Sequence, residues 1–236
     1  YKSINCNCKK INMPDLTLII PAKHEVESLP VFLEEIKNYK CKKFIVLQKE
    51  DLETKKAIKK IKNIKIVEQV NNGYGNALIE GINSVKTKYC CIINADGAMD
   101  PKYLDKMRKL CKNKDFVFAS RYQKPGGGSD DDTLVTLIGN YFFTFAGNFL
   151  FNLKISDILY TYILGKTSSF KNLKLKNFDF RICVEIPIKA KLQNMNYSCL
   201  PSYERIRIGG IKKVHALKDG FLILTEILKY FLKIKK

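Results

Sequence analysis

The stretch Tyr89-Cys-Cys-Ile-Ile-Asn-Ala-Asp-Gly-Ala-Met-Asp-Pro101 carries the clearest signal of the fold, because a strand, a polar loop and a helix start follow one another in it. Its apolar run from Tyr89 to Ile93 is short and uncharged, which is typical of a buried strand. Pro101 is favoured in the first turn of a helix. Asp96 therefore follows the carboxyl end of a strand, and in open parallel sheets this is where ligands bind.

Strand and helix signals alternate on both sides of this stretch. Further strands are predicted over 16–20, 44–47, 64–67 and 116–119, and helices over 28–39, 52–61, 74–85 and 101–111. Such alternation predicts an α/β fold, with a mostly parallel sheet and helices on both of its faces. Ser28 is expected to cap the first helix and Asp100 the helix that begins at Pro101.

The composition favours a folded chain with a strongly positive surface. Of the 236 residues, 46% are hydrophobic, and 42 Lys and Arg against 23 Asp and Glu give a net charge of +19. This excess favours a polyanionic partner, although an AT-biased coding sequence would also enrich lysine. Nucleic acid is the partner we do not expect, because the aromatic residues gather in apolar stripes instead of alternating with basic residues.

The cysteines show neither a disulfide nor a metal pattern. The eight of them include no CxxC pair, and the two histidines stand at no ligand spacing from them. We expect reduced thiols, and no metal at Cys6 and Cys8. No signal peptide is visible. Because the first residue is Tyr1 and not Met, we leave open that further residues, including membrane helices after Lys236, lie outside this sequence.

The stretch from Leu134 to Leu153 has no charged residue and is long enough to cross a bilayer. Its polar residues recur every four positions and so share one helical face. They are Thr136, Asn140, Thr144, Asn148 and Asn152. The opposite face is apolar and contains Phe142, Phe145 and Phe149. A spanning helix does not need such a stripe, so we expect a helix at the membrane interface or against protein, with a spanning helix as the alternative.

The C-terminal residues 221–236 form a second amphipathic pattern, with a basic polar face. Glu226, Lys229, Lys233 and Lys236 recur at three- and four-residue spacing, with leucines between them. A basic amphipathic helix is typical of a membrane surface, although a helix docked on its own domain has the same pattern. Two such segments in one cationic chain favour the membrane.

Asp96 is the residue we expect to bind a metal. A carboxylate at a strand end beside a helix start can hold Mg²⁺ or Mn²⁺, which prefer one or two carboxylates together with phosphate oxygens of the substrate. Capping of the following helix is the alternative for Asp96 and the expected role of Asp100.

Short motifs along the chain resemble one family. Pro21-Ala-Lys-His-Glu25 resembles the opening P-A-Y-N-E of family-two glycosyltransferases with the GT-A fold, and Asn94-Ala-Asp96 resembles the D-A-D variant of their D-x-D motif. Ser120-Arg-Tyr122, with Gly126 and Gly127 after it, is similar to a segment of the dolichol- and polyprenyl-phosphate mannosyltransferase group.

The second half of the chain extends the resemblance to about residue 225. Arg207, Gly210 and Lys213 stand in register with the late R-x-x-G-x-S-K of that group, and Glu185 and Pro201 fit its glutamate and V-P pair. The resemblance implies a GT-A, Rossmann-like domain over 15–219, in which 134–165 form the interfacial helix and acceptor region. An extension over 1–14 precedes it and a basic amphipathic helix over 220–236 follows it.

The resemblance also implies a site. The nucleotide pocket would be lined by Pro21, Ala22, Glu25, Gln48, Asn94 and Ala95. Asp96 would hold Mg²⁺ or Mn²⁺. Phosphate would be bound by Arg121, Arg207 and Lys213, which with Asp96 are the expected catalytic residues. The implied reaction is inverting transfer of a hexose from a nucleotide-diphosphate sugar, of the GDP-mannose or UDP-glucose type, to dolichyl or undecaprenyl phosphate. The implied place is the cytoplasmic face of an anionic membrane, where the protein would be peripheral.

Some positions depart from the family pattern. Gln48 stands where the family usually has Asp, Asn94 replaces the first Asp of D-A-D, Ala98 replaces a polar residue and Lys23 an aromatic one. Amides can hydrogen-bond a nucleoside but add no negative charge to a metal site. Weak metal binding, an unusual nucleotide and loss of activity are therefore open.

The nature of the acceptor decides whether a base is needed. The oxygen of a lipid phosphate is already anionic at neutral pH, whereas a sugar hydroxyl must lose its proton to a carboxylate. Asp157, Asp179 and Glu185 are the candidates for such a base. Two alternative functions follow: a transferase of the same fold that acts on a sugar hydroxyl of a glycan or glycolipid, and a non-catalytic membrane-binding relative.

Overall fold

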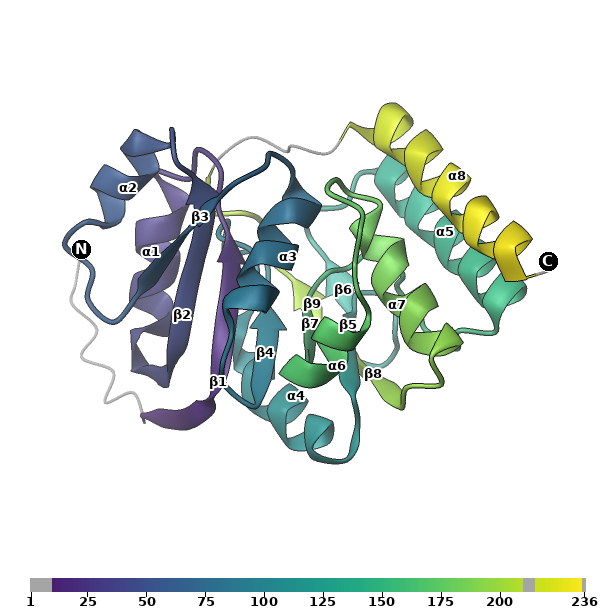
Figure 1. The fold of residues 1–236 in the computed structure, drawn as a ribbon, viewed down its shortest axis with the longest axis horizontal. Helices are drawn as coiled ribbons and strands as arrows, with labels where there is room; N and C mark the ends of the chain where they lie inside the picture. The colour runs from purple at the N-terminus through teal and green to yellow at the C-terminus, as the bar shows by residue number, and fades with distance from the viewer. Residues whose placement is uncertain (1–9, 210–214, 235–236) are drawn as a thin grey trace.

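A seven-stranded sheet forms the centre of the protein (Figure 1), in the order β3-β2-β1-β4-β7-β5-β8. The structure is a computed structural model and describes residues 10–209 and 215–234. The strands of this sheet are β1 (Ile11–Pro21), β2 (Tyr39–Gln48), β3 (Lys65–Gln69), β4 (Tyr89–Ile92), β5 (Phe116–Ser120), β7 (Ile163–Lys166) and β8 (Tyr197–Pro201). Among the described strands of this sheet, β7 alone runs antiparallel to its neighbours. The predicted α/β fold with a mostly parallel sheet is confirmed.

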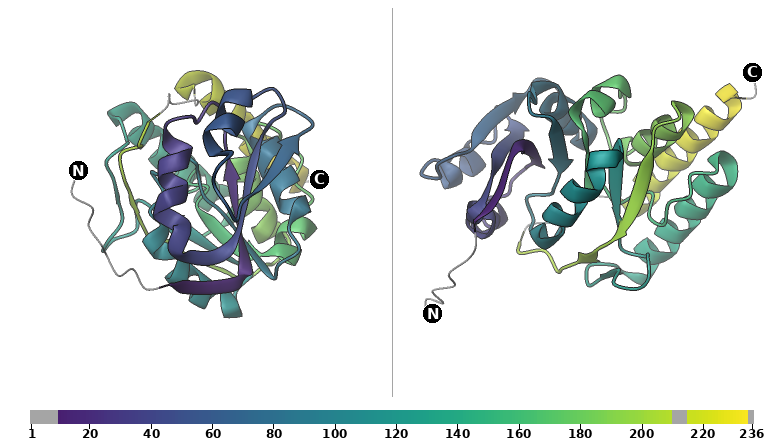
Figure 2. Two further views of the ribbon diagram at one scale, coloured as in Figure 1. Left: turned by 90° about the vertical axis from the view of Figure 1, so that its left-hand side faces the viewer. Right: turned by 90° about the horizontal axis from the view of Figure 1, so that it is seen from below.

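Helices cover both faces of the sheet (Figures 1 and 2). One buried cluster lies under α1 (Ser28–Glu35), α2 (Leu52–Ile58) and α4 (Leu104–Leu110). The other lies under α3 (Tyr74–Ser84), α5 (Leu134–Phe151), α6 (Thr167–Asn172), α7 (Ile182–Leu192) and α8 (Ala216–Ile234). The central strands read as continuous apolar runs because both of their faces are buried.

Short elements complete the chain. Three-residue 3₁₀ turns lie at η1 (Ile36–Asn38), η2 (Pro101–Tyr103) and η3 (Cys111–Asn113). A second sheet pairs β6 (Gly128–Ser129) with β9 (Tyr203–Glu204) in parallel. It ties the loop after β5 to the segment after β8, and both segments contribute to the site.

The first helix and second strand differ from the predicted boundaries. The helix ends at Glu35 and not at residue 39, and β2 begins at Tyr39, five residues before the predicted start, because its first residues already pair with β1. Lys43 lies in this strand almost fully buried, and its ammonium donates to the Tyr39 carbonyl at 2.8 Å. Ser28 does not cap the helix, since its hydroxyl donates to the Glu25 carboxylate at 2.5 Å. Asp100 does cap: it accepts the backbone N–H of Lys102 at 2.9 Å.

The two long helices α5 and α8 lie side by side at one end of the sheet (Figures 1 and 2). The central part of the polar stripe of α5 packs against protein. Asn140 and Thr144 are buried, and the side-chain amide of Asn148 donates to the Ile155 carbonyl and accepts from the Ile155 N–H. Phe145 and Phe149, on the opposite face, are 67% and 77% exposed. Within the described ranges, α5 is the one helix whose length and composition would allow it to cross a membrane.

Candidate functional site

Three strands bring the predicted pocket residues to one edge of the sheet. β1 lies between β2 and β4 and runs parallel to both, so Pro21, Gln48 and Asn94 stand along the same carboxyl edge. The backbone N–H of Ala22 continues the ladder by donating to Val46 at 2.9 Å. The buried Ala22, and Ala95 after β4, leave this edge lined by small side chains.

Buried polar groups hold the loop after β1. His24 has a left-handed backbone, with φ +52°, and its N–H donates to the Asp51 carboxylate at 2.8 Å. Burial opposes ionisation of Asp51, but hydrogen bonds from His24 and Thr54 outweigh it and lower the pKa of this carboxyl group. The backbone N–H of Glu25 donates to the Thr54 hydroxyl at 3.1 Å. Glu25 thus helps to fix the loop, and its negative charge also raises the pKa of Asp96.

Amide side chains stand where the family pattern has carboxylates. Gln48 donates to the side-chain oxygen of Asn72 at 2.6 Å. Asn94 accepts the Tyr74 hydroxyl at 3.1 Å, and that hydroxyl also lies 2.6 Å from the hydroxyl of Thr161. Sequence reasoning missed Asn72 and Tyr74 as site residues. The turn Asn71-Asn-Gly-Tyr-Gly75 at a strand end was the signal that could have identified them.

Asp96 lies between positive and negative groups. Its carboxylate accepts the backbone N–H of Ala98 at 3.1 Å and stands 4.0 Å from the Arg207 guanidinium. Burial raises the pKa of Asp96 and the charges of Glu25 and Asp131 raise it further, while Ala98 and Arg207 act in the opposite direction. Additional positive charge would therefore stabilise the ionised form of Asp96.

The donor set fits a cation that binds together with a diphosphate. Within residues 10–209 and 215–234, no group of three or more Asp, Glu, His or Cys side chains is placed to hold a metal. Asp96 contributes one carboxylate, and Mg²⁺ or Mn²⁺ commonly completes its shell with substrate phosphates and water. The residues present thus suit a metal shared with the substrate, and not one held by protein alone.

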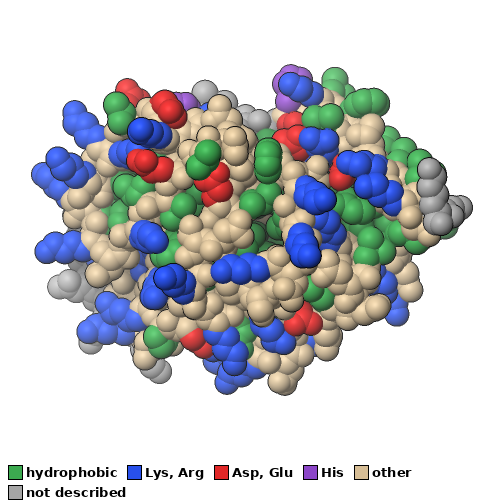
Figure 3. Space-filling view, in the orientation of Figure 1, with side chains coloured by type: hydrophobic (Ala, Val, Ile, Leu, Met, Phe, Trp, Pro, Cys, Tyr) green, Lys and Arg blue, Asp and Glu red, His purple; other side chains and the backbone are tan. Residues whose placement is uncertain are grey.

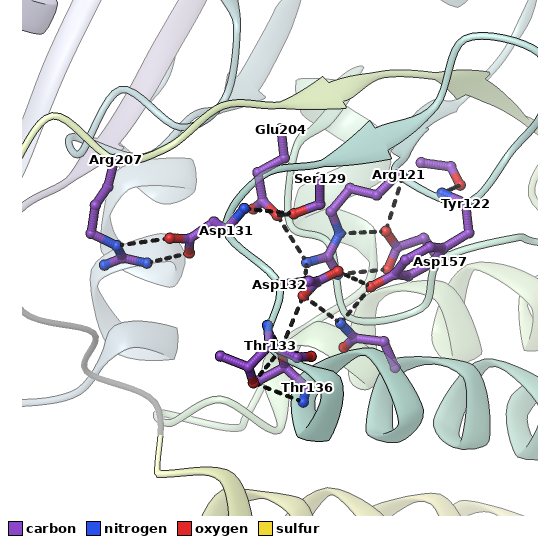
Figure 4. Close-up of polar contacts among 12 residues, drawn as sticks. Arg121, Tyr122, Ser129, Asp131, Asp132, Thr133, Thr136, Asp157, Glu204 and Arg207 are labelled. Carbon is purple, nitrogen blue, oxygen red and sulfur yellow. Dashed lines mark hydrogen bonds and ion pairs between the residues drawn. The ribbon is translucent and has the colours of Figure 1, made fainter.

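Arg207 lies on a loop, residues 205–209, that we call the arginine loop, and points toward Asp131 (Figure 4). The Ile208 N–H donates to the Asp96 carbonyl at 2.8 Å. Gly97 has φ +76°, and a Cβ there would come within 2.4 Å of the Ile208 side chain, so the loop needs a glycine beneath it. The Arg207 guanidinium binds Asp131 with two nitrogens, at 2.6 and 3.3 Å. It is about a fifth exposed, since 22% of its side chain reaches solvent.

Arg121 lies in a closed cluster of carboxylates (Figure 4). Its guanidinium binds Asp157 at 2.7 and 3.0 Å and Glu204 at 3.3 Å, and Asp132 stands 3.6 Å away. Only 9% of its side chain is exposed. Carboxylates thus already compensate this buried charge, and the contact of Arg121 with phosphate stays a prediction. Arg121 joins the loop after β5, the acidic loop (residues 130–132), the Asp157 segment and β9. Lys213, the third predicted phosphate ligand, lies outside the described residues.

The three candidate bases are all engaged elsewhere. Asp157 is buried against Arg121. Asp179 pairs with Arg181 at 2.7 Å; burial opposes ionisation, but the hydrogen bonds from Arg181 outweigh it and lower the pKa of Asp179. Glu185 is fully buried and binds Lys189 at 2.6 Å. None of these three carboxylates is presented to an acceptor beside Asp96.

The chain resembles solved structures of one fold. It superposes on glucosyl-3-phosphoglycerate synthase from Mycobacterium tuberculosis, in complex with Mn²⁺, UDP-glucose and phosphoglyceric acid, with a TM-score of 0.68 and 10% identity, covering 92% of this chain and 79% of that one. The same enzyme with phosphoglyceric acid gives a TM-score of 0.67 at 10% identity, covering 91% and 79%. A mycobacterial protein gives 0.65 at 9% identity, covering 91% and 74%. At these identities the likeness concerns the fold.

The family follows from the sequence itself. No curated protein matches the chain. The family model described as glycosyl transferase family 2 matches residues 17–174, which include the second half of β1, every strand from β2 to β7 and the carboxyl edge with Asp96. The chain therefore belongs to glycosyl transferase family 2 and is a glycosyltransferase with the GT-A fold.

Proposed function

We propose that this glycosyltransferase moves a hexose from a nucleotide-diphosphate sugar to a polyprenyl phosphate at a membrane surface, with inversion at the transferred carbon. One observation carries the proposal. The acidic loop that binds Arg207 leads directly into α5, whose exposed face is apolar along its whole length. If a polyprenyl phosphate bound at Arg207 through its phosphate, its polyprenyl chain could thus lie along the apolar face of α5.

The carboxyl edge of the sheet supports the donor part of the proposal. Pro21, Gln48 and Asn94 would line the nucleotide pocket, and Asp96 would share Mg²⁺ or Mn²⁺ with the diphosphate of a GDP-mannose or UDP-glucose type of donor. When bound, such a cation stabilises the charge that grows on the leaving diphosphate. The similar synthase has been solved with Mn²⁺ and UDP-glucose, which supports this assignment. Arg207 would add a fixed positive charge beside it.

The carboxylates support a phosphate as the acceptor. Asp157, Asp179 and Glu185 are each paired or buried, so none is positioned to take a proton from a hydroxyl. A phosphate oxygen is anionic and needs no such base. A guanidinium binds phosphate through two nitrogens, and Arg207 already binds the Asp131 carboxylate in this way. Asp131 thus occupies the positions that two phosphate oxygens would take.

The helix pair supports a lipid as the carrier of that phosphate. The apolar residues of α5 that are more than half exposed are Leu134, Val135, Ile138, Tyr141, Phe142, Phe145 and Phe149. On α8 the exposed apolar residues are Leu217, Phe221, Leu228, Leu232 and Ile234. Figure 3 shows hydrophobic side chains over this end of the molecule, with Lys and Arg side chains among them. An apolar surface beside cations suits peripheral binding to an anionic leaflet, which we place at the cytoplasmic face of a membrane.

Product analysis tests the reaction. The full chain would be incubated with Mn²⁺, radiolabelled UDP-glucose or GDP-mannose, and one of three acceptors: a polyprenyl phosphate in anionic vesicles, phosphoglyceric acid or an oligosaccharide. We expect label in the lipid extract with the first acceptor. Label only in a soluble product would replace the lipid with a soluble acceptor. Loss of transfer with every donor and acceptor, from a folded protein, would favour a non-catalytic membrane-binding relative.

Vesicle binding tests the membrane part separately. Replacing Phe142, Phe145 and Phe149 by Ser should release the protein from anionic vesicles, because the three side chains would enter the apolar layer. Thr225→Ala on the exposed surface of α8 is the control. Salt should weaken binding only in part, because it screens the lysines but not the apolar contacts. A protein that never sediments with such vesicles would contradict the membrane proposal.

A further inference from the structure

A segment between α6 and α7, residues 174–180, connects the C-terminal helix with the nucleotide pocket. We call it the strap. It has no regular structure; Asn177 at its centre contacts α8, and the residues that follow contact the start of α3. The site described above makes no use of it, although it carries buried polar groups at its centre.

The outer contact of the strap is a buried amide between two carboxylates. Asn177 donates from the same nitrogen to Glu185 at 2.9 Å and to Glu226 of α8 at 3.1 Å. The three residues are 7%, 0% and 3% exposed. The Tyr230 hydroxyl of α8 also donates to Glu185, at 3.2 Å. Lys189 lies 2.6 Å from Glu185, and further charge balance comes from a lysine on α8 beside Glu226. Such satisfied buried networks hold their members in one arrangement.

The inner contact of the strap is with Gly73 and the first turn of α3. The Phe178 carbonyl accepts the Asn76 N–H at 3.1 Å. The approach is so close that a Cβ at Gly73 would lie 2.1 Å from that carbonyl, and one at Gly75 would lie 2.2 Å from the carbonyl of Asn177. Backbone therefore packs directly on backbone, and a displacement of the strap must move the turn.

The turn carries the side chain that reaches the pocket. The Tyr74 ring stacks on Phe180 of the strap, with ring centres 5.0 Å apart. The Tyr74 hydroxyl donates to Asn94 at 3.1 Å. A continuous series of contacts thus runs from Glu226 through Asn177 and Phe180 to Tyr74, and ends at Asn94.

We infer that Asn177 and Glu226 are positioning residues that set the affinity for the donor nucleotide, so that the docking of α8 controls the nucleotide pocket. The inference rests on the proposed donor pocket at Asn94. It is independent of what the acceptor is. Asn177 and Glu226 do not touch the substrate. They hold Tyr74 in place, and Tyr74 in turn holds Asn94 in the orientation that binds the nucleotide.

The experiment measures nucleotide affinity in variants of the full chain. The Kd of UDP and of GDP, each with Mn²⁺, would be determined by calorimetry for Asn177→Ala, Glu226→Ala, Glu226→Gln and Tyr230→Phe. Thr225→Ala is the matched control, because Thr225 is exposed, precedes Glu226 and donates only to the Leu222 carbonyl of its own helix. Thermal unfolding of each variant shows whether it is folded.

We expect the two Ala variants to raise the Kd about three- to tenfold, which lies within the range in which residues along a coupling path act. Glu226→Gln, which can still accept from Asn177, should restore most of the affinity, and Thr225→Ala should leave it unchanged. An unchanged Kd in folded Asn177→Ala and Glu226→Ala overturns the inference. Should both fail to fold, Tyr230→Phe decides: it removes the hydroxyl by which α8 binds Glu185, the other carboxylate that holds Asn177, and an unchanged Kd overturns the inference equally.

One further variant separates this inference from the proposed function. Asn94→Ala should weaken binding of the same nucleotides. If Asn94→Ala weakens binding and the strap variants do not, the donor pocket stands and the role of the strap is wrong. If Asn94→Ala has no effect, the proposed donor pocket itself is wrong, and the inference falls with it.

Discussion

Arg121 and Arg207 lie on either side of the acidic loop, and they differ in how many carboxylates each one faces. Arg121 has Asp132, Asp157 and Glu204 around it and is buried. Arg207 binds Asp131, has Asp96 at 4.0 Å and is partly exposed. The first guanidinium is more than balanced by negative charge, whereas the second faces fewer carboxylates and is the one that we propose exchanges its carboxylate for a phosphate. Both match phosphate-binding positions of the family motif, so the motif alone does not separate a structural arginine from one available to substrate.

The largest effect should come from Arg121→Ala. Removing this guanidinium leaves Asp157 and Glu204 buried without their partner, and breaking a buried ion pair from one side costs about 3–5 kcal/mol. Urea unfolding would measure the loss in the free energy of unfolding. Arg181→Ala is the control, because the pair of Arg181 with Asp179, about one third exposed, should contribute about 1 kcal/mol or less. A stable Arg121→Ala protein that binds nucleotide poorly would instead support the phosphate contact predicted from the sequence.

The carboxylate beside Arg207 should show opposite effects on activity and on stability. Asp96→Asn should reduce turnover with Mn²⁺ more than about a hundredfold, since charge stabilisation by a metal is worth several kcal/mol. Burial raises the pKa of Asp96, so the folded protein binds its proton more tightly than the unfolded chain does. Its contribution to stability therefore falls as the pH rises through that raised pKa.

The same variant should consequently be slightly more stable than the parent at neutral pH. Melting temperatures at pH 7 and pH 4 provide the check, because the gain should shrink at the lower pH, where the carboxyl group takes up its proton. A variant that is less stable at pH 7, or one that keeps a tenth of the parental rate, would contradict the role given to Asp96.

Arg207→Ala should act on turnover and hardly on folding. Loss of one fixed donor to a developing charge typically costs about a hundredfold or more in rate. The free energy of unfolding should change by about 1 kcal/mol or less, because the pair with Asp131 is partly exposed. Arg207→Lys keeps the charge but loses the two-pronged geometry, so its rate should fall between those of the parent and of Arg207→Ala. If Arg207→Ala proved as destabilising as Arg121→Ala, the distinction between the two arginines would be lost.

The smallest effect should come from Asp131→Asn. If Asp131 binds the Arg207 nitrogens that an acceptor phosphate needs, weakening this ion pair should lower the KM for that acceptor about two- to fivefold. This change corresponds to a partly exposed ion pair worth up to about 1 kcal/mol. Steady-state kinetics with varied acceptor concentration would measure this. A higher KM would mean that Asp131 orients Arg207 for the substrate and does not compete with it.

Local patterns were sufficient for the centre of the fold. β1 and β4 are buried on both faces, so their apolar runs were visible without any partner. The start of β2 was not visible in this way, because residues 39–43 include three lysines and lack a long apolar run. Their pairing with β1 is what makes them part of a strand. β7 was missed for a related reason: Ile163–Lys166 is short, and its place between β4 and β5 depends on residues far away in the sequence.

The candidate site was predictable only where a motif marked it. Asp96, Arg207 and the residues after β1 were found through their motifs and strand-end positions. Asp131 and Tyr74 were not, since Asp131 lies in a loop and Tyr74 at the very start of α3, and long-range contacts set the position of both. Asp157 appeared in the sequence as a candidate base. Its burial against Arg121 is a property of the tertiary structure and not of any spacing along the chain.

The antiparallel strand β7 has a consequence for how such proteins can diversify. Residues 121–162 leave the sheet after β5 and return at β7, and the two ends of this excursion meet at one hydrogen bond, from the Ala119 N–H to the Tyr162 carbonyl at 3.0 Å. A segment whose ends adjoin can be exchanged without changing the spacing of the strands that flank it, provided that the new segment fills the places of Phe143, Phe151 and Ile158 in the core. The acidic loop and α5 both lie inside this excursion, whereas Asp96 and the residues after β1 lie outside it. Recombination of this one insertion between relatives would exchange what lies beside Arg207 while the sheet edge stays as it is.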